Sequence, residues 1–306
     1  MSEVWLDSEA WSFDSRKGGF LTERFKGKLF DSYFGKNSHL TQNHSLKLFL
    51  RINLKQINHQ LTAKDSIKRS FAIKDWTMDE WYNFTKQFER QSYMWNNRFW
   101  LIPPKNFTLF DSKQGSRTTR PNVQCLLITQ ITNSPGNTHR TIDVVNLDVD
   151  AIKKQRQISN VGSGTFKSNA RHIDSMDIKP RDITYEDDQD VEHTIKNHYT
   201  ITHELGHAIG LGHVGILKSR PQCTFAIALK KNGIKNVSSH LRRGANADVC
   251  YGEFDAPGLA ENIMGYGTKF EEVNAQPWIE RVAMHTNTIA RDWKVSLVPV
   301  APKIVI

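Results

Sequence analysis

The residues best suited to chemistry lie between positions 203 and 213, in the run H-E-L-G-H-A-I-G-L-G-H. If this run is helical, His203 and His207 lie four residues apart and present their imidazole rings on one face, about one turn from each other. Two neutral imidazoles at that spacing can bind one metal ion, at zinc–nitrogen distances of about 2.0–2.1 Å. Glu204 projects further round the helix, so its carboxylate can hydrogen-bond a water on the metal and act as a general base.

A glycine in the same run allows a third ligand. Gly210 follows the second histidine by three residues, and glycine readily adopts the left-handed conformation that ends a helix. The chain can then turn and bring His213 back to the metal. Three neutral nitrogen ligands leave a fourth position for water, whose pKa zinc lowers to about 7. The sequence therefore predicts a catalytic zinc site formed by His203, His207 and His213, with Glu204 as the general base.

The spacing H-E-x-x-H-x-x-G-x-x-H resembles the signature of the metzincin zinc endopeptidases, which carry a methionine turn further along the chain. The segment Glu261–Gly267, E-N-I-M-G-Y-G, resembles that turn. Its M-x-Y spacing is similar to that of astacin-like and serralysin-like members, in which the tyrosine reaches the metal. The resemblance implies that Tyr266 is a further metal ligand and stabilises the oxyanion, while Met264 lies under the site without taking part in the chemistry.

Other interpretations of these residues remain open at this stage. The three histidines could be solvated or could pack in a core, although five matching positions at fixed spacing favour a metal site. A single buried methionine ordinarily fills a core, and only its place in a glycine-rich turn after the histidines favours a methionine turn.

The metzincin resemblance also implies a fold. We expect an α+β protein with a mixed twisted sheet and helices in an upper half, the zinc helix at the cleft, and an irregular lower half with a C-terminal helix. Residues 1–43 show no sustained period and are expected to form an N-terminal extension or leader. A metallopeptidase domain would then cover 44–306, with an upper subdomain at 44–210 and a lower subdomain at 211–306.

Several elements can be predicted from periodicity. The alternation over His44–Ile57 predicts a strand, and the aromatic spacing over Asp75–Trp95 predicts an amphipathic helix. Three further strands are expected at Arg98–Ile102, Asn122–Thr132 and Thr141–Val149. The order of strand, helix and then several strands agrees with an α+β fold.

The zinc helix is expected to run from about Val191 to Ala208. The acidic run Glu186–Asp190 precedes it and would cap its free N–H groups and offset its dipole. His193 and His198 would then lie on that helix as ordinary polar or packing residues. A closing helix is expected at Gln276–Trp293. The stretch 214–260, between the third histidine and the methionine turn, is long enough to form a wall of the cleft that sets specificity.

Composition and charge limit the class of partner. The chain has 306 residues, 38% of them hydrophobic, and a net charge of +9. It is therefore long enough for a sizeable core in one or two domains. A positive charge permits attraction to nucleic acid, anionic envelopes or acidic proteins, but the basic residues are dispersed and indicate a solvated surface. No nucleic-acid motif is found, so we expect no nucleic-acid partner.

Location is left open by the sequence. Met1–Phe20 lacks the apolar run of a secretory signal, and no apolar segment approaches the roughly 20 residues that span a bilayer. A cytoplasmic protein and one delivered by a specialised secretion apparatus both agree with this. The three cysteines are too few for a disulfide framework and are expected to be free thiols, although Cys223 and Cys250 could pair in an oxidising compartment.

The function expected from these features is that of a zinc-dependent endopeptidase acting on a protein or peptide. The substrate would bind along an edge strand from within 140–178. The segment Asn262–Gly267 and its sequel are similar to bacterial toxin-type metallopeptidases, and a delivered toxin or effector would imply a cognate inhibitor or immunity protein as a partner. One alternative is a hydrolase of peptidoglycan peptides. Another is a catalytically silent zinc-binding interaction module, against which Glu204 and the open coordination position count.

Overall fold

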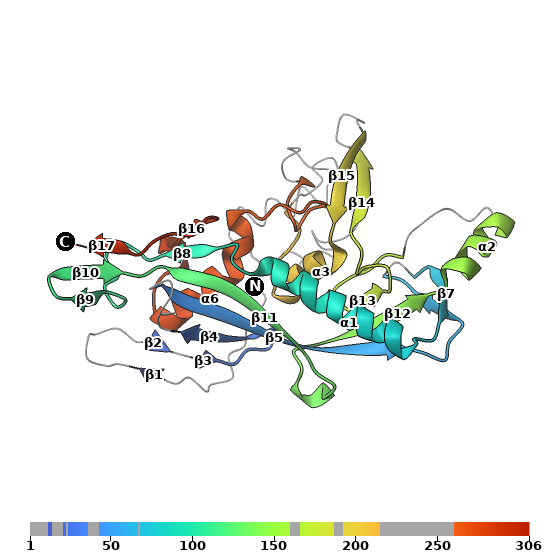
Figure 1. The fold of residues 1–306 in the computed structure, drawn as a ribbon, viewed down its shortest axis with the longest axis horizontal. Helices are drawn as coiled ribbons and strands as arrows, with labels where there is room; N and C mark the ends of the chain where they lie inside the picture. The colour runs from blue at the N-terminus through green and yellow to red at the C-terminus, as the bar shows by residue number, and fades with distance from the viewer. Residues whose placement is uncertain are drawn as a thin grey trace, which may run out of the picture.

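The computed structural model of the protein describes residues 12–13, 21–22, 24–35, 43–66, 68–159, 166–186, 192–214 and 260–305. Within these ranges the fold is α+β, as expected: a large mixed sheet forms the body, and helices pack against it (Figure 1). The sheet is long and twisted. The helix α2 (Val149–Ser159) lies at one end of the molecule, and a small separate sheet lies at the opposite end (Figure 1).

The central strand of the main sheet is β5 (His44–Ile57), which confirms the prediction for that segment. Its side chains alternate, and every second one from Leu46 to Ile52 is fully buried. β5 pairs in parallel with β11 (Val123–Ile131) and with β12 (Arg140–Leu147). Its other partner, β4 (Asp31–Gly35), is antiparallel. Part of the expected extension at 1–43 is therefore built into the main sheet.

The remaining strands complete a 10-stranded sheet among the described residues. Its path runs β16-β8-β11-β5-β12-β7-β6, with β3, β4 and β13 pairing off that path. The bounds not yet given are β3 (Arg24–Phe25), β6 (Thr62–Lys64), β7 (Ser70–Lys74), β8 (Trp100–Ile102), β13 (His172–Asp174) and β16 (Lys294–Ser296). The strands predicted at Arg98–Ile102, Asn122–Thr132 and Thr141–Val149 are thus confirmed as β8, β11 and β12.

Three smaller sheets lie outside the main one. They are formed by β1 (Ser12–Phe13) with β2 (Leu21–Thr22), by β9 (Ser112–Gln114), β10 (Arg117–Arg120) and β17 (Lys303–Val305), and by β14 (Arg181–Glu186) with β15 (Glu192–His198). The β14–β15 hairpin stands away from the main sheet beside α3 (Figure 1).

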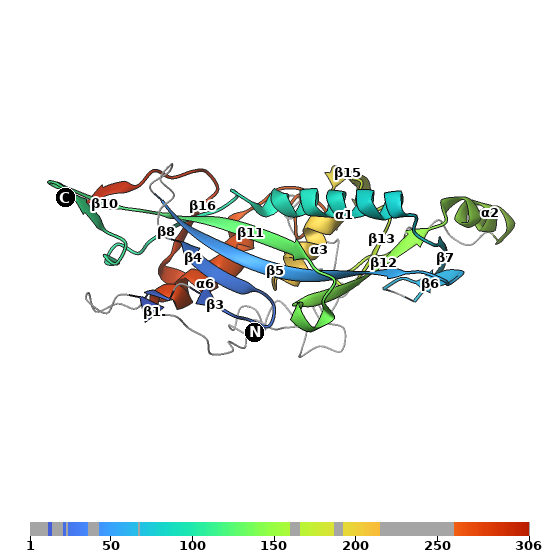
Figure 2. The same cartoon turned by 60° about the horizontal axis from the view of Figure 1, so that its bottom comes forward.

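The predicted amphipathic helix is confirmed as α1 (Met78–Ser92), followed by a 3-10 turn at Tyr93–Trp95. Thr77 and Glu80 form a capping box at its start, in which each side chain bonds the backbone of the other residue. Phe84 and Phe88 are buried on its inner face. α1 crosses over the sheet between the parallel strands β5 and β11, because parallel strands need such a connection (Figure 2).

The expected start of the zinc helix is wrong. The helix α3 runs only over Thr200–Ala208, whereas Glu192–His198 is the strand β15. The reason is tertiary: this segment pairs with β14, and its chain bends at Asn197, whose φ is +59°. His193 and His198 therefore lie on a strand and not on the helix.

The acidic run does not cap α3. Glu186 ends β14, and 187–190 lie outside the described residues. The residue before α3, Tyr199, makes no side-chain capping bond. The first turn of α3 instead gains its stability from burial, since Thr200 to Gly206 are all buried.

The closing helix is shorter than expected. α6 runs over Gln276–Thr286 and ends where Asn287 adopts a left-handed conformation, with φ of +50°. The chain then continues through a 3-10 turn, Ala290–Asp292. The other 3-10 turns are Pro135–Asn137 and Glu272–Ala275. In the ranges given above, no helix combines the length and the apolar character needed to cross a membrane, as expected.

One large core joins the sheet to α1, α3 and α6. The inward side chains of β5 and β11 meet Trp95 at the end of α1 and Trp278 on α6, whose rings stack 6.1 Å apart. Trp95 Nε1 donates to the carbonyl of Thr202 at 2.9 Å, and the Thr202 hydroxyl donates to the carbonyl of Gln91 at 3.1 Å. These bonds fix α3 against the end of α1.

The cysteine prediction is confirmed in one case. Cys125 is a free thiol, buried in β11, and burial raises its pKa. Cys223 and Cys250 lie outside the described residues, as do positions 215–259 of the expected cleft wall.

Candidate metal centre

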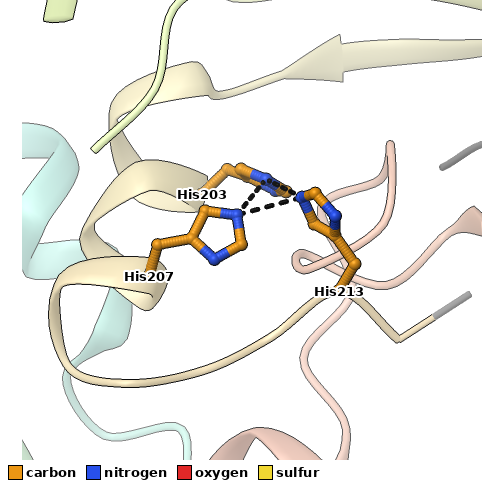
Figure 3. Close-up of side chains that lie close together, drawn as sticks. All are labelled: His203, His207 and His213. Atoms are coloured by element: carbon orange, nitrogen blue, oxygen red, sulfur yellow. Dashed lines mark hydrogen bonds between the residues drawn. The ribbon is translucent and has the colours of Figure 1, made fainter. Parts of the chain in front are cut away.

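Three histidines converge at the C-terminal end of α3. His203 and His207 extend from successive turns of the helix, and His213 comes from the segment after it (Figure 3). Their Nε2 atoms form a triangle with edges of 3.1 Å between His203 and His207, 3.0 Å between His207 and His213, and 3.3 Å between His203 and His213. This is the one group of three or more His, Cys, Asp or Glu side chains in the described ranges that could hold a metal ion.

The chain returns to the site because of Gly210, as predicted. Its φ is +99°, a conformation that side chains resist. The amide of Leu211 donates to the carbonyl of Gly206 at 3.0 Å, which closes the helix end. The next two residues then carry His213 back under the helix.

The second nitrogen of two rings is bonded to the backbone. His203 Nδ1 lies 2.7 Å from the carbonyl of Ile263, and His207 Nδ1 lies 2.8 Å from the carbonyl of Leu211. A carbonyl can only accept, so each Nδ1 carries the proton and each Nε2 keeps its lone pair. Lone pairs repel one another at these separations. A cation among them removes the repulsion, and one ion about 2.1 Å from each nitrogen in tetrahedral geometry would set the nitrogens about 3.4 Å apart.

The environment of the rings keeps them neutral. Burial lowers the pKa of His203 well below its usual value, and the nearby charges of His207 and His213 lower it further. Burial likewise lowers the pKa of His207 to about 4; the bond to Leu211 opposes this shift and the charge of Arg140 adds to it. Both rings are therefore neutral at pH 7, the state in which imidazole binds a metal.

A tight turn lies directly under the histidines. Ile263 and Met264 in this turn are fully buried. The turn is fixed by Asn262, whose side chain accepts from the amide of Met264 at 2.8 Å and donates to Glu271 at 2.8 Å. A Cβ atom at Gly206 would lie only 2.2 Å from Met264 Sδ, so the turn and α3 are in close contact.

Tyr266 belongs to the same turn and is half-buried. Its amide donates to the carbonyl of Ala260 at 2.9 Å, and its carbonyl accepts from His198 Nδ1 at 2.9 Å. The ring of His198 lies 5.5 Å from that of His203. His198 therefore connects the β14–β15 hairpin to the turn that carries Tyr266.

Glu204 lies on α3 directly after His203 and is buried. Its carboxylate is close enough to the guanidinium of Arg140, at the start of β12, to act on the pKa of that arginine. The charge of Arg140 also acts on His207. The structure thus places one carboxylate and one guanidinium beside the three histidines.

Two residues near the site were not predicted to have a role there. His198 was expected to be an ordinary helix residue, and Arg140 was not singled out. Glu192–His198 contains one apolar residue, Ile195, so its sequence gives little sign of the strand that ends beside α3. Nothing in the sequence around Arg140 indicates that this residue, 63 positions before His203, lies beside the histidines.

Comparison with known proteins adds no relative. No protein-family model, no curated protein and no solved structure matches this chain. The chemistry of the site must therefore be inferred from the residues themselves.

Proposed function

We propose that the protein is a zinc-dependent endopeptidase, with His203, His207 and His213 as protein ligands and Glu204 as general base. The observation that supports this most strongly is the convergence of the three Nε2 atoms, each within 3.3 Å of the other two. A structural zinc site is normally closed by four protein ligands, whereas three ligands are typical of a catalytic site.

The donor set favours a transition metal, for which we propose zinc, over magnesium and calcium. Imidazole nitrogen suits zinc, copper, iron and nickel, whereas magnesium and calcium prefer oxygen. When bound, zinc would act as a Lewis acid and make water a nucleophile near neutral pH.

The side chains around the metal have distinct roles in this proposal. Glu204 accepts a proton from the attacking water and returns it to the leaving amine. As the metzincin resemblance implies, Tyr266 would be a further ligand of the metal and would stabilise the oxyanion. Met264 forms the floor on which α3 rests. The close packing of that floor against α3 supports the comparison with a methionine turn.

The substrate would bind as an added strand. Among the described strands, β13 pairs only with β12, so its outer edge is open. β13 lies beside α3 in both views (Figures 1 and 2). An extended peptide can pair with such an edge through its backbone. This edge strand comes from within 140–178, the range expected from the sequence.

The proposal can be tested with the purified full-length protein. The zinc-loaded protein is incubated with a denatured proteome and, separately, with peptidoglycan, and new peptide termini are mapped by mass spectrometry. Termini should arise in the proteome sample, disappear when a chelator is added, and return with zinc. Glu204→Gln, which changes one oxygen to an amide, serves as the control. New termini only in peptidoglycan would contradict the endopeptidase proposal, and so would a protein with full zinc that produces none.

A further inference from the structure

Arg140 lies at the start of β12, and its charge interacts with Glu204 and His207 of α3. It pairs in register with Ile52 of β5, so the two side chains share one face of the sheet. Ile142 and Val144 follow on that same face, because side chains alternate along a strand. Both pack in the core with the apolar residues of α3. The guanidinium of Arg140 therefore emerges on the side where the histidines lie.

The charge of Arg140 is compensated only in part by the described residues around it. Its Nη1 donates to the carbonyl of Ala170 at 3.4 Å, just before β13. Burial lowers its pKa, the charge of Arg171 lowers it further, and Glu204 opposes these effects. Within the described ranges, neither arginine forms an ion pair with a carboxylate. Two guanidinium groups are thus close neighbours beside the metal site.

Other partly buried arginines among the described residues are paired with an aspartate. Arg51 binds Asp31 at 2.5 Å, Arg69 binds Asp65 at 2.7 Å, and Arg120 binds Asp111 at 2.6 Å. Arg281, which is fully buried, instead lies over the ring of Phe30 at 4.6 Å. Arg140 differs from all of these, because its strongest described contact is one long bond to a carbonyl.

An anion would complete this arrangement. Like charges that are close together and partly withdrawn from water repel each other, and a negative group between them relieves the repulsion. The fork of a guanidinium matches the two oxygens of a carboxylate. Arg171 is exposed and Arg140 is half-buried, so an anion from outside can reach both.

We propose that Arg140, with Arg171 beside it, binds a carboxylate of the substrate next to the metal centre. This inference rests on the proposed peptidase function. It assigns the substrate class: peptides with a glutamate or aspartate near the scissile bond, or with a free C-terminal carboxylate there.

The first test uses matched peptides. Acetylated and amidated peptides carry either Glu or its neutral isostere Gln, in turn, at each of three positions on either side of the bond that is cut. A further series carries Gln at these positions but ends in a free carboxylate. We expect kcat/KM to be about 10- to 100-fold higher for one carboxylate-bearing peptide than for its neutral partner, the size of a charged hydrogen bond. The series that contains this peptide shows whether the protein recognises an acidic side chain or a C-terminal carboxylate.

Variants then assign the preference to the arginines. In Arg140→Gln the ratio between the charged and neutral peptides should fall to near one. Arg140→Lys keeps the charge but loses the fork, and Arg171→Gln changes an exposed position; each should lower the ratio several-fold. Arg291→Gln is the matched control, since this arginine is 84% exposed and lies in the 3-10 turn Ala290–Asp292. Its ratio should equal that of the parent protein.

A binding measurement separates this inference from the proposed function. Zinc-loaded Glu204→Gln protein is titrated calorimetrically with the same peptide pairs, with and without Arg140→Gln. Tighter binding of the carboxylate peptide that depends on Arg140 supports the carboxylate site even if the parent protein cuts no peptide. Cleavage without any preference, together with equal binding of both peptides, would overturn the inference and leave the peptidase function standing. If Arg140→Gln melts far below the parent protein, Arg140→Lys and Arg171→Gln decide the outcome by the same ratio.

Discussion

Gly206 and Met264 are packed so closely that a side chain at position 206 would force Met264 to move: a Cβ there would lie 2.2 Å from Met264 Sδ. Gly206 is the residue before the second histidine, and Met264 follows Ile263, whose carbonyl orients His203. The metal helix and the turn beneath it are therefore one packed unit. A change in this contact should be felt both in stability and in metal affinity.

Gly206→Ala should destabilise the protein by about 1–3 kcal/mol, the usual range for overpacking a core. Alanine itself favours a helix, so any loss reflects the contact with Met264 and with Trp95 Cζ2, which would lie 2.9 Å away. We also expect weaker metal binding, because α3 must shift away from the turn. Chemical unfolding and a competitive metal titration measure the two effects.

Met264→Ala provides the second half of a double-mutant cycle. Alone it should cost about 2–5 kcal/mol, because it leaves a cavity. Combined with Gly206→Ala it should cost clearly less than the sum of the two, since the added methyl group occupies the space that the sulfur leaves. Strict additivity of the free energies of unfolding would show that the two residues do not press on each other.

Metal content tests the three histidines. The purified protein should hold about one zinc per chain, and His207→Ala or His213→Ala should lose nearly all of it, because two imidazoles do not hold the ion firmly. His59→Ala is the control: this side chain is 88% exposed and pairs with Asp75 at the surface. Elemental analysis after dialysis gives the result. Full retention of zinc in His207→Ala would exclude that residue as a ligand.

Acid should destabilise the metal-free protein. Burial lowers the pKa of His198 to about 4, with the bonds to Tyr266 and Gly267 opposing and Arg181 adding to the shift. The unfolded chain, with a histidine pKa of about 6.5, therefore binds more protons between these two values. Stability is complete above about pH 6.5 and falls as the pH drops toward about 4, by on the order of 3 kcal/mol for this residue.

Urea unfolding at a series of pH values, with chelator present, measures this effect. In His198→Gln the free energy of unfolding should depend less steeply on pH. Some dependence should remain, because burial lowers the pKa of His203 and His207 as well. If the free energy of unfolding changes equally with pH in the parent protein and in His198→Gln, His198 is not held neutral in the folded state. With metal present, affinity should also weaken below about pH 6, since protons compete for the ligands.

The parts of the site that could be predicted are those encoded locally. The spacing of His203, His207 and His213 and the position of Gly210 lie within one helix end, where geometry follows from residue number. The same holds for β5 and α1, in which the apolar side chains recur at the strand or helix period over the whole element. In each case the side chains that define the pattern also form the contact.

The parts that could not be predicted depend on distant partners. The acidic run before Glu192 indicated a helix start, but pairing with β14 makes that segment a strand and moves the start of α3 to Thr200. Arg140 reaches the site only because β12 lies next to β5 in the sheet. α6 ends early because Asn287 turns left-handed, which asparagine permits but does not require. Local sequence does not contain these contacts.

The last prediction separates Glu204 from Tyr266, which are assigned different roles at one metal. Glu204→Gln should keep its zinc and lose a factor of about 10² to 10⁴ in kcat, because it removes the proton acceptor. Tyr266→Phe removes one phenol oxygen and keeps the backbone contacts with Ala260 and His198. If that oxygen stabilises the oxyanion, kcat should fall by about 10² to 10³ with little change in KM. If Tyr266 only packs the turn, kcat should stay near that of the parent protein and the melting temperature should fall instead. Measuring kcat, KM, zinc content and melting temperature for both variants decides between these roles, and a Tyr266→Phe protein at full speed would leave Glu204 as the one side chain of the pair that acts on the reacting groups.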